Sequence, residues 1–224
     1  MAGTRQMMAS ELQEALAVEI GKPALNRDDI PTVEHMIKAC DPLVVIEEES
    51  NIIRLVHYTT QEYLERTQNA WFENAQIDIT RRMATYLSFS AFNTGLCDSY
   101  DEFEERKATH KLYSYAAENW GHHAREALVR GMEAWELVDF LESDRKREAA
   151  SQIAMARPNN YYGDKLRDVT ATHLAGYFGT CEVMALLLEK GHSPSATDTY
   201  ENAAVVGRNK WSRNSSRASA GKRR

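Results

Sequence analysis

Apolar residues recur along this chain at the spacing of amphipathic helices, with one interruption near residue 50. The first two helices are predicted by apolar positions that share one helical face: Leu12, Leu16, Val33, Met36 and Ile37. We expect a capping box from Ser10 to Gln13 to begin the first helix. Pro31 is typical of a first helical position and predicts the start of the second helix.

Two β-branched runs interrupt this helical pattern. Residues 43–46 read LVVI and residues 52–56 read IIRLV, on either side of the polar turn EEESN at 47–51. Such runs around a short polar turn predict a β-hairpin. Two helices followed by a hairpin are the order of a winged-helix domain, so residues 1–66 predict a partial winged-helix-like domain.

The pattern is helical throughout residues 67–157. A capping box at 59–62 leads into this region, and helices of about 10–16 residues with short polar joints predict antiparallel packing in a helical linker bundle. One predicted helix places Ile77, Thr80, Ala84 and Leu87 on a single face. We interpret the aromatic residues that follow as core: Tyr100, Phe103, Tyr113, Tyr115, Trp120, Trp135 and Phe140.

The most specific pattern lies at residues 168–198, which read DVTATHLAGYFGTCEVMALLLEKGHSPSATD. An ankyrin repeat has about 33 residues, two helices and a T-P-L-H-x-A opening. The positions that match the opening, the turn between the helices, the inner face of the second helix and its end are Thr170, His173, Ala175, Gly179, Leu187, Leu188 and Gly191. We therefore predict a single ankyrin-type helix-turn-helix repeat at 164–200, with His173 in a structural role.

The predicted repeat departs from the ankyrin pattern at two positions. Ala171 replaces the proline of the opening, and Thr172 replaces its buried leucine. One repeat cannot bury its own apolar faces, and about three are needed for independent stability. We expect this repeat to pack against the preceding helices and to leave an adhesive edge near residues 186–188.

The last 20 residues differ in charge from the rest of the chain. Residues 1–204 carry 20 basic and 33 acidic side chains, a net charge of −13, whereas residues 205–224 carry seven basic and no acidic ones. Residues 201–224 predict a basic, disordered tail. Back-translated and read one base later, this tail can give RTPLLWAATNGHETAVELLLEKDA, a good next ankyrin repeat. We hypothesise a frameshift; the competing interpretation is a genuine basic tail that binds nucleic acid or directs nuclear import.

Four stretches of the sequence resemble one protein family. They are SELQEALAVE at 10–19, EEESNIIRLVHYTTQEYLERTQ at 47–68, LYSYAAENWGHHAR at 112–125 and the predicted repeat. Together they resemble the segment that follows the nucleotide-binding domain in fungal NACHT–ankyrin proteins, which are NLR-like STAND ATPases. The resemblance implies a mainly α fold: a winged-helix-like unit, a helical linker and ankyrin repeats that sense a ligand. It also implies a fragment or truncated relative of such a signalling receptor.

Motifs for catalysis are missing from the sequence. It contains no GxxxxGK[ST] phosphate loop, no GxSxG and no HExxH. His122 and His123 are adjacent, so on a helix they point about 100° apart, and we interpret them as a solvated or capping pair. The three sparse cysteines favour buried thiols in a reducing compartment. We expect no catalytic residue, no cofactor and no metal site.

These patterns predict a non-enzymatic protein–protein interaction module. Its expected partner is another protein or a full-length NACHT–ankyrin relative, with no small-molecule substrate and no membrane contact. The alternative is a nucleic-acid-binding protein that uses the winged helix and the basic tail. Three glutamates at 47–49 in the hairpin turn would repel phosphate and disfavour that alternative. The expected location is cytoplasmic, or nuclear if the tail is genuine.

Overall fold

The computed structural model describes residues 5–155 and 168–198 of the 224-residue chain. It is mainly helical with one two-stranded antiparallel hairpin, which confirms the predicted fold class at that level. The elements in chain order are α1 (Ala9–Ala17), the short 3-10 helix η1 (Arg27–Asp29), α2 (Val33–Ala39), β1 (Val44–Glu47), β2 (Ile52–Leu55), α3 (Tyr58–Trp71), α4 (Ala75–Leu87), η2 (Ser90–Phe92), α5 (Tyr100–Thr109), α6 (Tyr113–Val129), α7 (Trp135–Glu142), α8 (Asp144–Ala154), α9 (Ala171–Phe178) and α10 (Cys181–Glu189).

Parts of the predicted domains lie outside the described residues. The predicted basic tail, 201–224, does so entirely. The same holds for residues 1–4 of the winged-helix-like segment, 156–157 of the helical linker, and 164–167 and 199–200 of the predicted repeat.

The hairpin lies where the two β-branched runs predict it. Val44 is opposite Leu55, and Glu47 is opposite Ile52. Arg54 forms an ion pair with Glu47 at 3.1 Å across the two strands. This contact neutralises one of the three glutamates that begin the turn.

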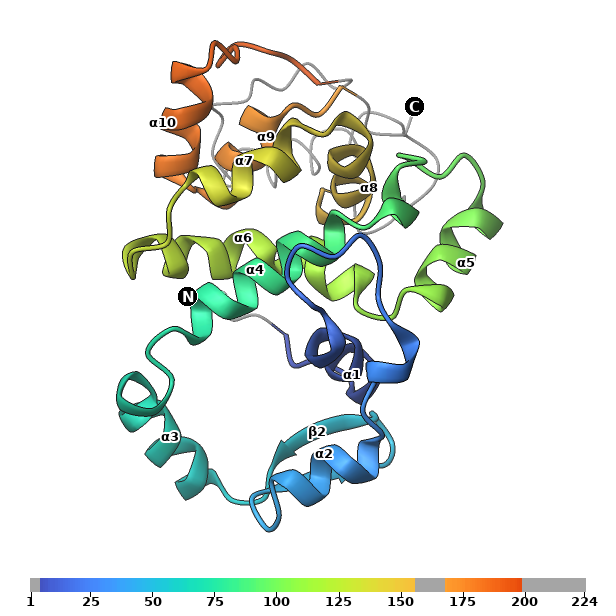
Figure 1. Cartoon of the computed structure of the whole chain (residues 1–224), viewed down its shortest axis with the longest axis vertical. Coiled ribbons are helices and arrows are strands. Elements are labelled where there is room, and N and C mark those ends of the chain that lie inside the picture. Colours follow the sequence, from blue (N-terminus) through green and yellow to red (C-terminus); the bar gives the residue numbers. More distant parts are fainter. Residues whose placement is uncertain (1–4, 156–167, 199–224) are drawn as a thin grey trace, which may run out of the picture.

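Helix α2, the hairpin and α3 lie together at one end of the molecule (Figure 1). This end buries few side chains. Between residues 19 and 66, all of which the structure describes, Met36 is the one buried residue. Large apolar side chains of this segment are exposed, namely Leu43, Val45, Val56, Tyr58 and Tyr63. Burial of apolar area drives folding, so this segment gains little stability from its own packing.

The main core forms around α4 and α6, which run side by side (Figure 1). The predicted face of α4 is buried as expected at Ile77, Thr80, Ala84 and Leu87. The largest fully buried side chains include Tyr86, Phe89, Phe92, Phe103, Tyr113, Trp120 and Phe178. The pairing of α4 with α6 therefore organises the packing of the later helices. The core prediction is wrong for Tyr100 and Trp135, which are 57% and 63% exposed because each stands at the first residue of its helix, at the edge of the bundle.

Helix α1 is fixed to this core by hydrogen bonds to a buried carboxylate. Glu14 accepts a hydrogen bond from the Tyr86 hydroxyl at 2.5 Å and another from the backbone N–H of Leu112 at 3.0 Å. Burial of the Tyr86 hydroxyl, and its contact with the Glu14 carboxylate, raise the pKa of Tyr86. Met8, just before α1, forms a β-bridge with Ile52 of β2, and the N–H of Ala9 donates to the carbonyl of Asn51 at 2.8 Å, so α1 contacts both the bundle and the hairpin.

The predicted start of the first helix is wrong by two residues. Helix α1 begins at Ala9, so Ser10 lies inside it. The cause is Glu11, whose buried carboxylate accepts a hydrogen bond from the N–H of Met8 at 2.8 Å. Arg5 pairs with the same carboxylate at 2.5 and 2.7 Å. A charged acceptor binds an N–H more strongly than a serine hydroxyl does.

The two later helix starts also differ from the prediction. Helix α2 begins after Thr32, whose hydroxyl accepts a hydrogen bond from the N–H of His35, so Pro31 lies outside the helix. Helix α3 begins after His57, and the ring of His57 accepts a hydrogen bond from the N–H of Thr59. The predicted capping box at 59–62 is therefore inside α3. In both helices the side chain that accepts from the first free N–H groups is a different one from the residue that the prediction used.

Candidate functional site

The helix pair α9–α10 holds the residues that the sequence singles out, and Thr170 and His173 form its first turn. The Thr170 hydroxyl accepts a hydrogen bond from the N–H of His173, and the Thr170 N–H donates to Nδ1 of His173 at 3.1 Å. The Thr170 hydroxyl oxygen lies 2.7 Å from the same Nδ1. Because Nδ1 accepts from an N–H, it carries no proton. His173 is fully buried and closes the start of α9.

Thr172, which replaces the leucine of the ankyrin pattern, is fully buried as well. Its hydroxyl donates to the backbone carbonyl of Ser193 at 3.1 Å. A buried hydroxyl without a partner is costly, and this hydrogen bond removes that cost. The contact also ties the start of α9 to the segment that follows α10.

Two glycines make the turns of the helix pair. Gly179 ends α9 with φ at 71°, in the left-handed region that glycine adopts without strain. Gly191 follows α10 with φ at 89°. The N–H of Thr180 then donates to the carbonyl of Ala175 at 3.0 Å, and Ala175 itself is buried. This bond satisfies the Ala175 carbonyl near the end of α9, where the chain turns back into α10.

The predicted inner face of α10 holds for Leu187 but not for Leu188. Leu187 and Val183 are fully buried, one helical turn apart, whereas Leu188 is 40% exposed. Adjacent helical residues point about 100° apart, so Leu187 and Leu188 cannot both face inward. Leu188 lies at the border of an outer face with Glu182, Ala185 and Glu189, which are exposed.

The helix pair docks on the bundle through Phe178. Its ring lies against Gly121 of α6, where an added Cβ would come within 2.1 Å of Cγ of Phe178. The Phe178 ring packs edge-on against Trp120, with centroids 4.9 Å apart. At the other end, Glu142 of α7 pairs with Lys190 at 2.7 Å and with His192 at 3.0 Å.

The histidine pair of α6 is not a solvated pair, which corrects the interpretation of His122 and His123. Both side chains are half-buried, and the two rings have different neighbours. His122 packs edge-on against Phe178, and His123 bonds through Nδ1 to Gln76 of α4 at 2.8 Å. Burial, followed by the neighbouring His122, lowers the pKa of His123 to about 4. His123 is thus a neutral link between α4 and α6.

The cysteines differ in burial, which corrects the expectation of buried thiols for two of them. All three are unpaired; Cys97 is buried, whereas Cys40 and Cys181 are exposed. Burial raises the pKa of the Cys97 thiol, which disfavours a nucleophilic thiolate. Within residues 5–155 and 168–198, no group of three or more histidine, cysteine or acidic side chains is arranged to hold a metal ion.

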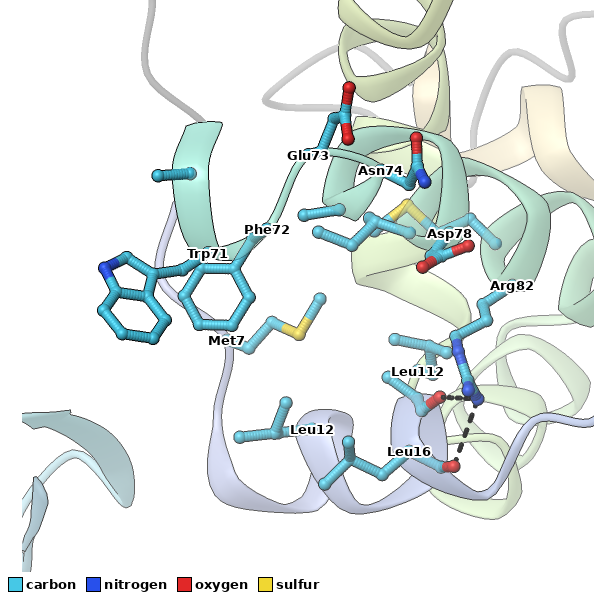
Figure 2. Close-up of a pocket in the computed structure, with 15 residues that line it drawn as sticks. Met7, Leu12, Leu16, Trp71, Phe72, Glu73, Asn74, Asp78, Arg82 and Leu112 are labelled. Carbon is cyan, nitrogen blue, oxygen red and sulfur yellow. Dashed lines mark hydrogen bonds between the residues drawn. The ribbon is translucent and has the colours of Figure 1, made fainter. Parts of the chain in front are cut away.

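A groove that the sequence does not predict opens beside α1 and has a volume of about 720 Å³ (Figure 2). Its walls come from α1, from the joint between α3 and α4, and from the first turns of α4. The lining residues are Met7, Leu12, Ala15, Leu16, Ala70, Trp71, Phe72, Glu73, Asn74, Ala75, Asp78, Ile79, Arg82, Met83 and Leu112. The adjacent aromatic residues Trp71 and Phe72, at the end of a helix that is otherwise polar, are the sequence signal for it.

A scan against protein-family models, a search of curated proteins and a search of solved structures each found no match for this chain. No helix in the described part of the chain combines the length and the apolar character needed to cross a bilayer. Functional inference for this chain therefore rests on its own residues.

Proposed function

We propose that this chain is a non-enzymatic protein–protein interaction module, related to the segment of fungal NACHT–ankyrin receptors that follows the nucleotide-binding domain. One observation carries the proposal. The α9–α10 pair is closed by the Thr170–His173 turn and by Gly179, and one of its faces docks on the bundle through Phe178. Its other face borders on the partly exposed Leu188.

Stacking of a second helix pair is the interaction that this geometry supports. Repeat proteins gain stability mainly at the interfaces between neighbouring repeats, so an uncovered repeat face favours another repeat. The proposed partner is accordingly a protein with a helix-pair repeat, such as a full-length relative of this chain. The three unpaired thiols are consistent with a reducing compartment such as the cytoplasm.

Insertion of a consensus ankyrin repeat directly after Asp198 in the full chain tests this proposal. If α10 presents a repeat interface, the added repeat raises the thermal midpoint by several degrees, and the chain unfolds in one transition. Leu188→Glu should abolish this gain. Val129→Glu, at a position that is 80% exposed on α6, should leave the gain unchanged.

Two results would contradict the proposal. One is an added repeat that leaves the thermal midpoint unchanged, and the other is equal loss from Leu188→Glu and Val129→Glu. The predicted frameshift has its own test, which is to sequence the transcript across codons 196–224 and beyond. Continuing repeats in the next frame support kinship with ankyrin proteins. A frame without repeats argues for a genuine basic tail and removes that support.

A further inference from the structure

Large apolar side chains are exposed along the groove beside α1. Trp71 is 64% exposed, Phe72 57% and Leu16 52%, and all three lie on its walls. Figure 2 shows Trp71 and Phe72 on one side of the groove and Leu12 and Leu16 of α1 on the other. Contiguous exposed apolar patches mark interaction sites more often than isolated exposed residues do.

The two walls of the groove are held in place by Arg82. This guanidinium of α4 donates to the backbone carbonyls of Leu16 at 3.2 Å and Val18 at 2.6 Å, at the C-terminal end of α1. A third bond reaches the carbonyl of Ala15 at 3.3 Å. A cation at this end of a helix binds carbonyls that have no partner within the helix. The groove is thus formed before any partner arrives, which reduces the entropic cost of binding.

The charged residues that line the groove favour a basic occupant. Glu73 and Asp78 line it and are exposed, and within the described residues neither takes part in a salt bridge. Arg81, which forms its ion pair with Glu136, is close enough to Asp78 to interact with its charge as well. The single cation of the lining, Arg82, is already occupied by α1. The groove is therefore apolar with two carboxylates at its edge. A second copy of this chain would bring the same carboxylates and a net charge of −6, so it is a poor occupant.

We propose that this groove binds an amphipathic helix of a partner protein, with apolar side chains inserted between α1 and Phe72 and a lysine or arginine beside Glu73 and Asp78. Helix-in-groove recognition places apolar residues at i, i+3, i+4 and i+7 against such a surface. Trp71 and Phe72 are more than half exposed, and a helix can cover both along with Leu16, whereas a small molecule is bound where most of its own surface is buried. This surface lies apart from α9–α10 and does not depend on the function proposed for that pair.

The test uses the full chain and a labelled 18-residue helical peptide of leucine and lysine, followed by fluorescence anisotropy. A peptide with the same leucines and with glutamate in place of lysine serves as the charge control. We expect the leucine–lysine peptide to bind at least tenfold more tightly than its acidic counterpart. Trp71→Ala combined with Phe72→Ala should weaken binding at least tenfold. Trp135→Ala, at an equally exposed tryptophan of α7, should not change it.

A second pair of variants separates local charge from net charge. Glu73→Gln with Asp78→Asn should weaken binding several-fold, whereas Glu48→Gln with Glu49→Gln, in the exposed hairpin turn, should not. Leu188→Glu should also leave peptide binding unchanged, which keeps this result distinct from that for the repeat face. Equal effects from both charge pairs, equal effects from Trp71/Phe72 and Trp135 variants, or no peptide binding at millimolar concentration would overturn the proposal.

Discussion

Gly121 is the residue on which the docking of the α9–α10 pair depends most directly. Glycine inside a helix costs roughly 0.5–1 kcal/mol relative to alanine, so its presence in α6 needs a compensating contact. That contact is the Phe178 ring, which occupies the space where a Cβ would stand, 2.1 Å from its Cγ. The missing side chain lets the ring reach Trp120 and His122.

Gly121→Ala should therefore destabilise the chain, against the helix propensity of alanine. We expect a loss of about 1–3 kcal/mol in the free energy of unfolding, the usual cost of an overpacked core. Phe178→Ala alone should cost about 3–5 kcal/mol, and the double variant should cost less than the sum of the two. Urea unfolding measures all three. A Gly121→Ala chain that is more stable than the parent would show that Phe178 does not sit against α6.

Which residues the sequence reveals depends on how local their contacts are. Thr170, His173 and Gly179 act within one turn of α9, so a spacing pattern finds them. Gly121 and Arg82 act on residues 57 and 64 positions away, at Phe178 and Val18, and nothing near them in the sequence marks those partners. The groove is not predicted from the sequence either, because its walls come from segments that lie far apart along the chain.

The pairing of α4 with α6 is held partly by a side chain that must remain neutral. His123 of α6 bonds to Gln76 of α4, and its Nε2 lies 3.4 Å from the Tyr115 hydroxyl. Protonation would place a charge in a half-buried position beside His122. The helical spacing of apolar residues predicts both helices. It does not predict this polar link, because apolar spacing carries no information about which polar side chains meet.

We expect the stability of the chain to fall in acid through His123. Its pKa is lowered to about 4 by burial, whereas an unfolded histidine titrates near 6.5. The unfolded chain therefore binds the proton more readily, and this contribution to stability is complete above about pH 6.5 and is lost as the pH falls toward 4. The loss amounts to about 3 kcal/mol.

His123→Gln removes this titration while keeping an amide that can donate to Gln76. Urea unfolding of parent and variant between pH 7 and pH 4 isolates the difference, since other acidic groups titrate in both chains. The parent should lose stability more steeply than the variant across this interval. Parallel curves would mean that His123 is as accessible in the folded chain as in the unfolded one.

At the scale of the molecule, α1 packs with later helices and not only with the hairpin that is nearer in sequence. Its contacts join it to α4 and to the start of α6. Glu14 satisfies Tyr86 and Leu112, and Arg5 reaches Glu118 of α6 at 3.3 Å. The domain boundary predicted at residue 66 follows composition and element order, which do not report these distant hydrogen bonds. We therefore expect α1 to unfold together with α4 and α6.

Deletion of residues 1–18 should destabilise the whole bundle rather than only the hairpin end. It leaves the N–H of Leu112 and the hydroxyl of Tyr86 without their acceptor, and each such buried group costs about 1–3 kcal/mol. A synthetic peptide of residues 1–18 should restore part of the lost thermal midpoint in a concentration-dependent way. Unchanged melting of the shortened chain would show that α1 contributes nothing to the bundle.

The bond between Glu14 and Leu112 also has a consequence for the order of folding. The two residues are 98 positions apart, and closing so long a loop costs more entropy than forming any hydrogen bond within a helix. Contacts of this kind form late, after the local ones that they join. During synthesis α1 leaves the ribosome before α6, so its bond to Leu112 can form only after the start of α6 has emerged. The groove, which α1 and Leu112 both line, is therefore completed only after the segment up to residue 112 has been synthesised.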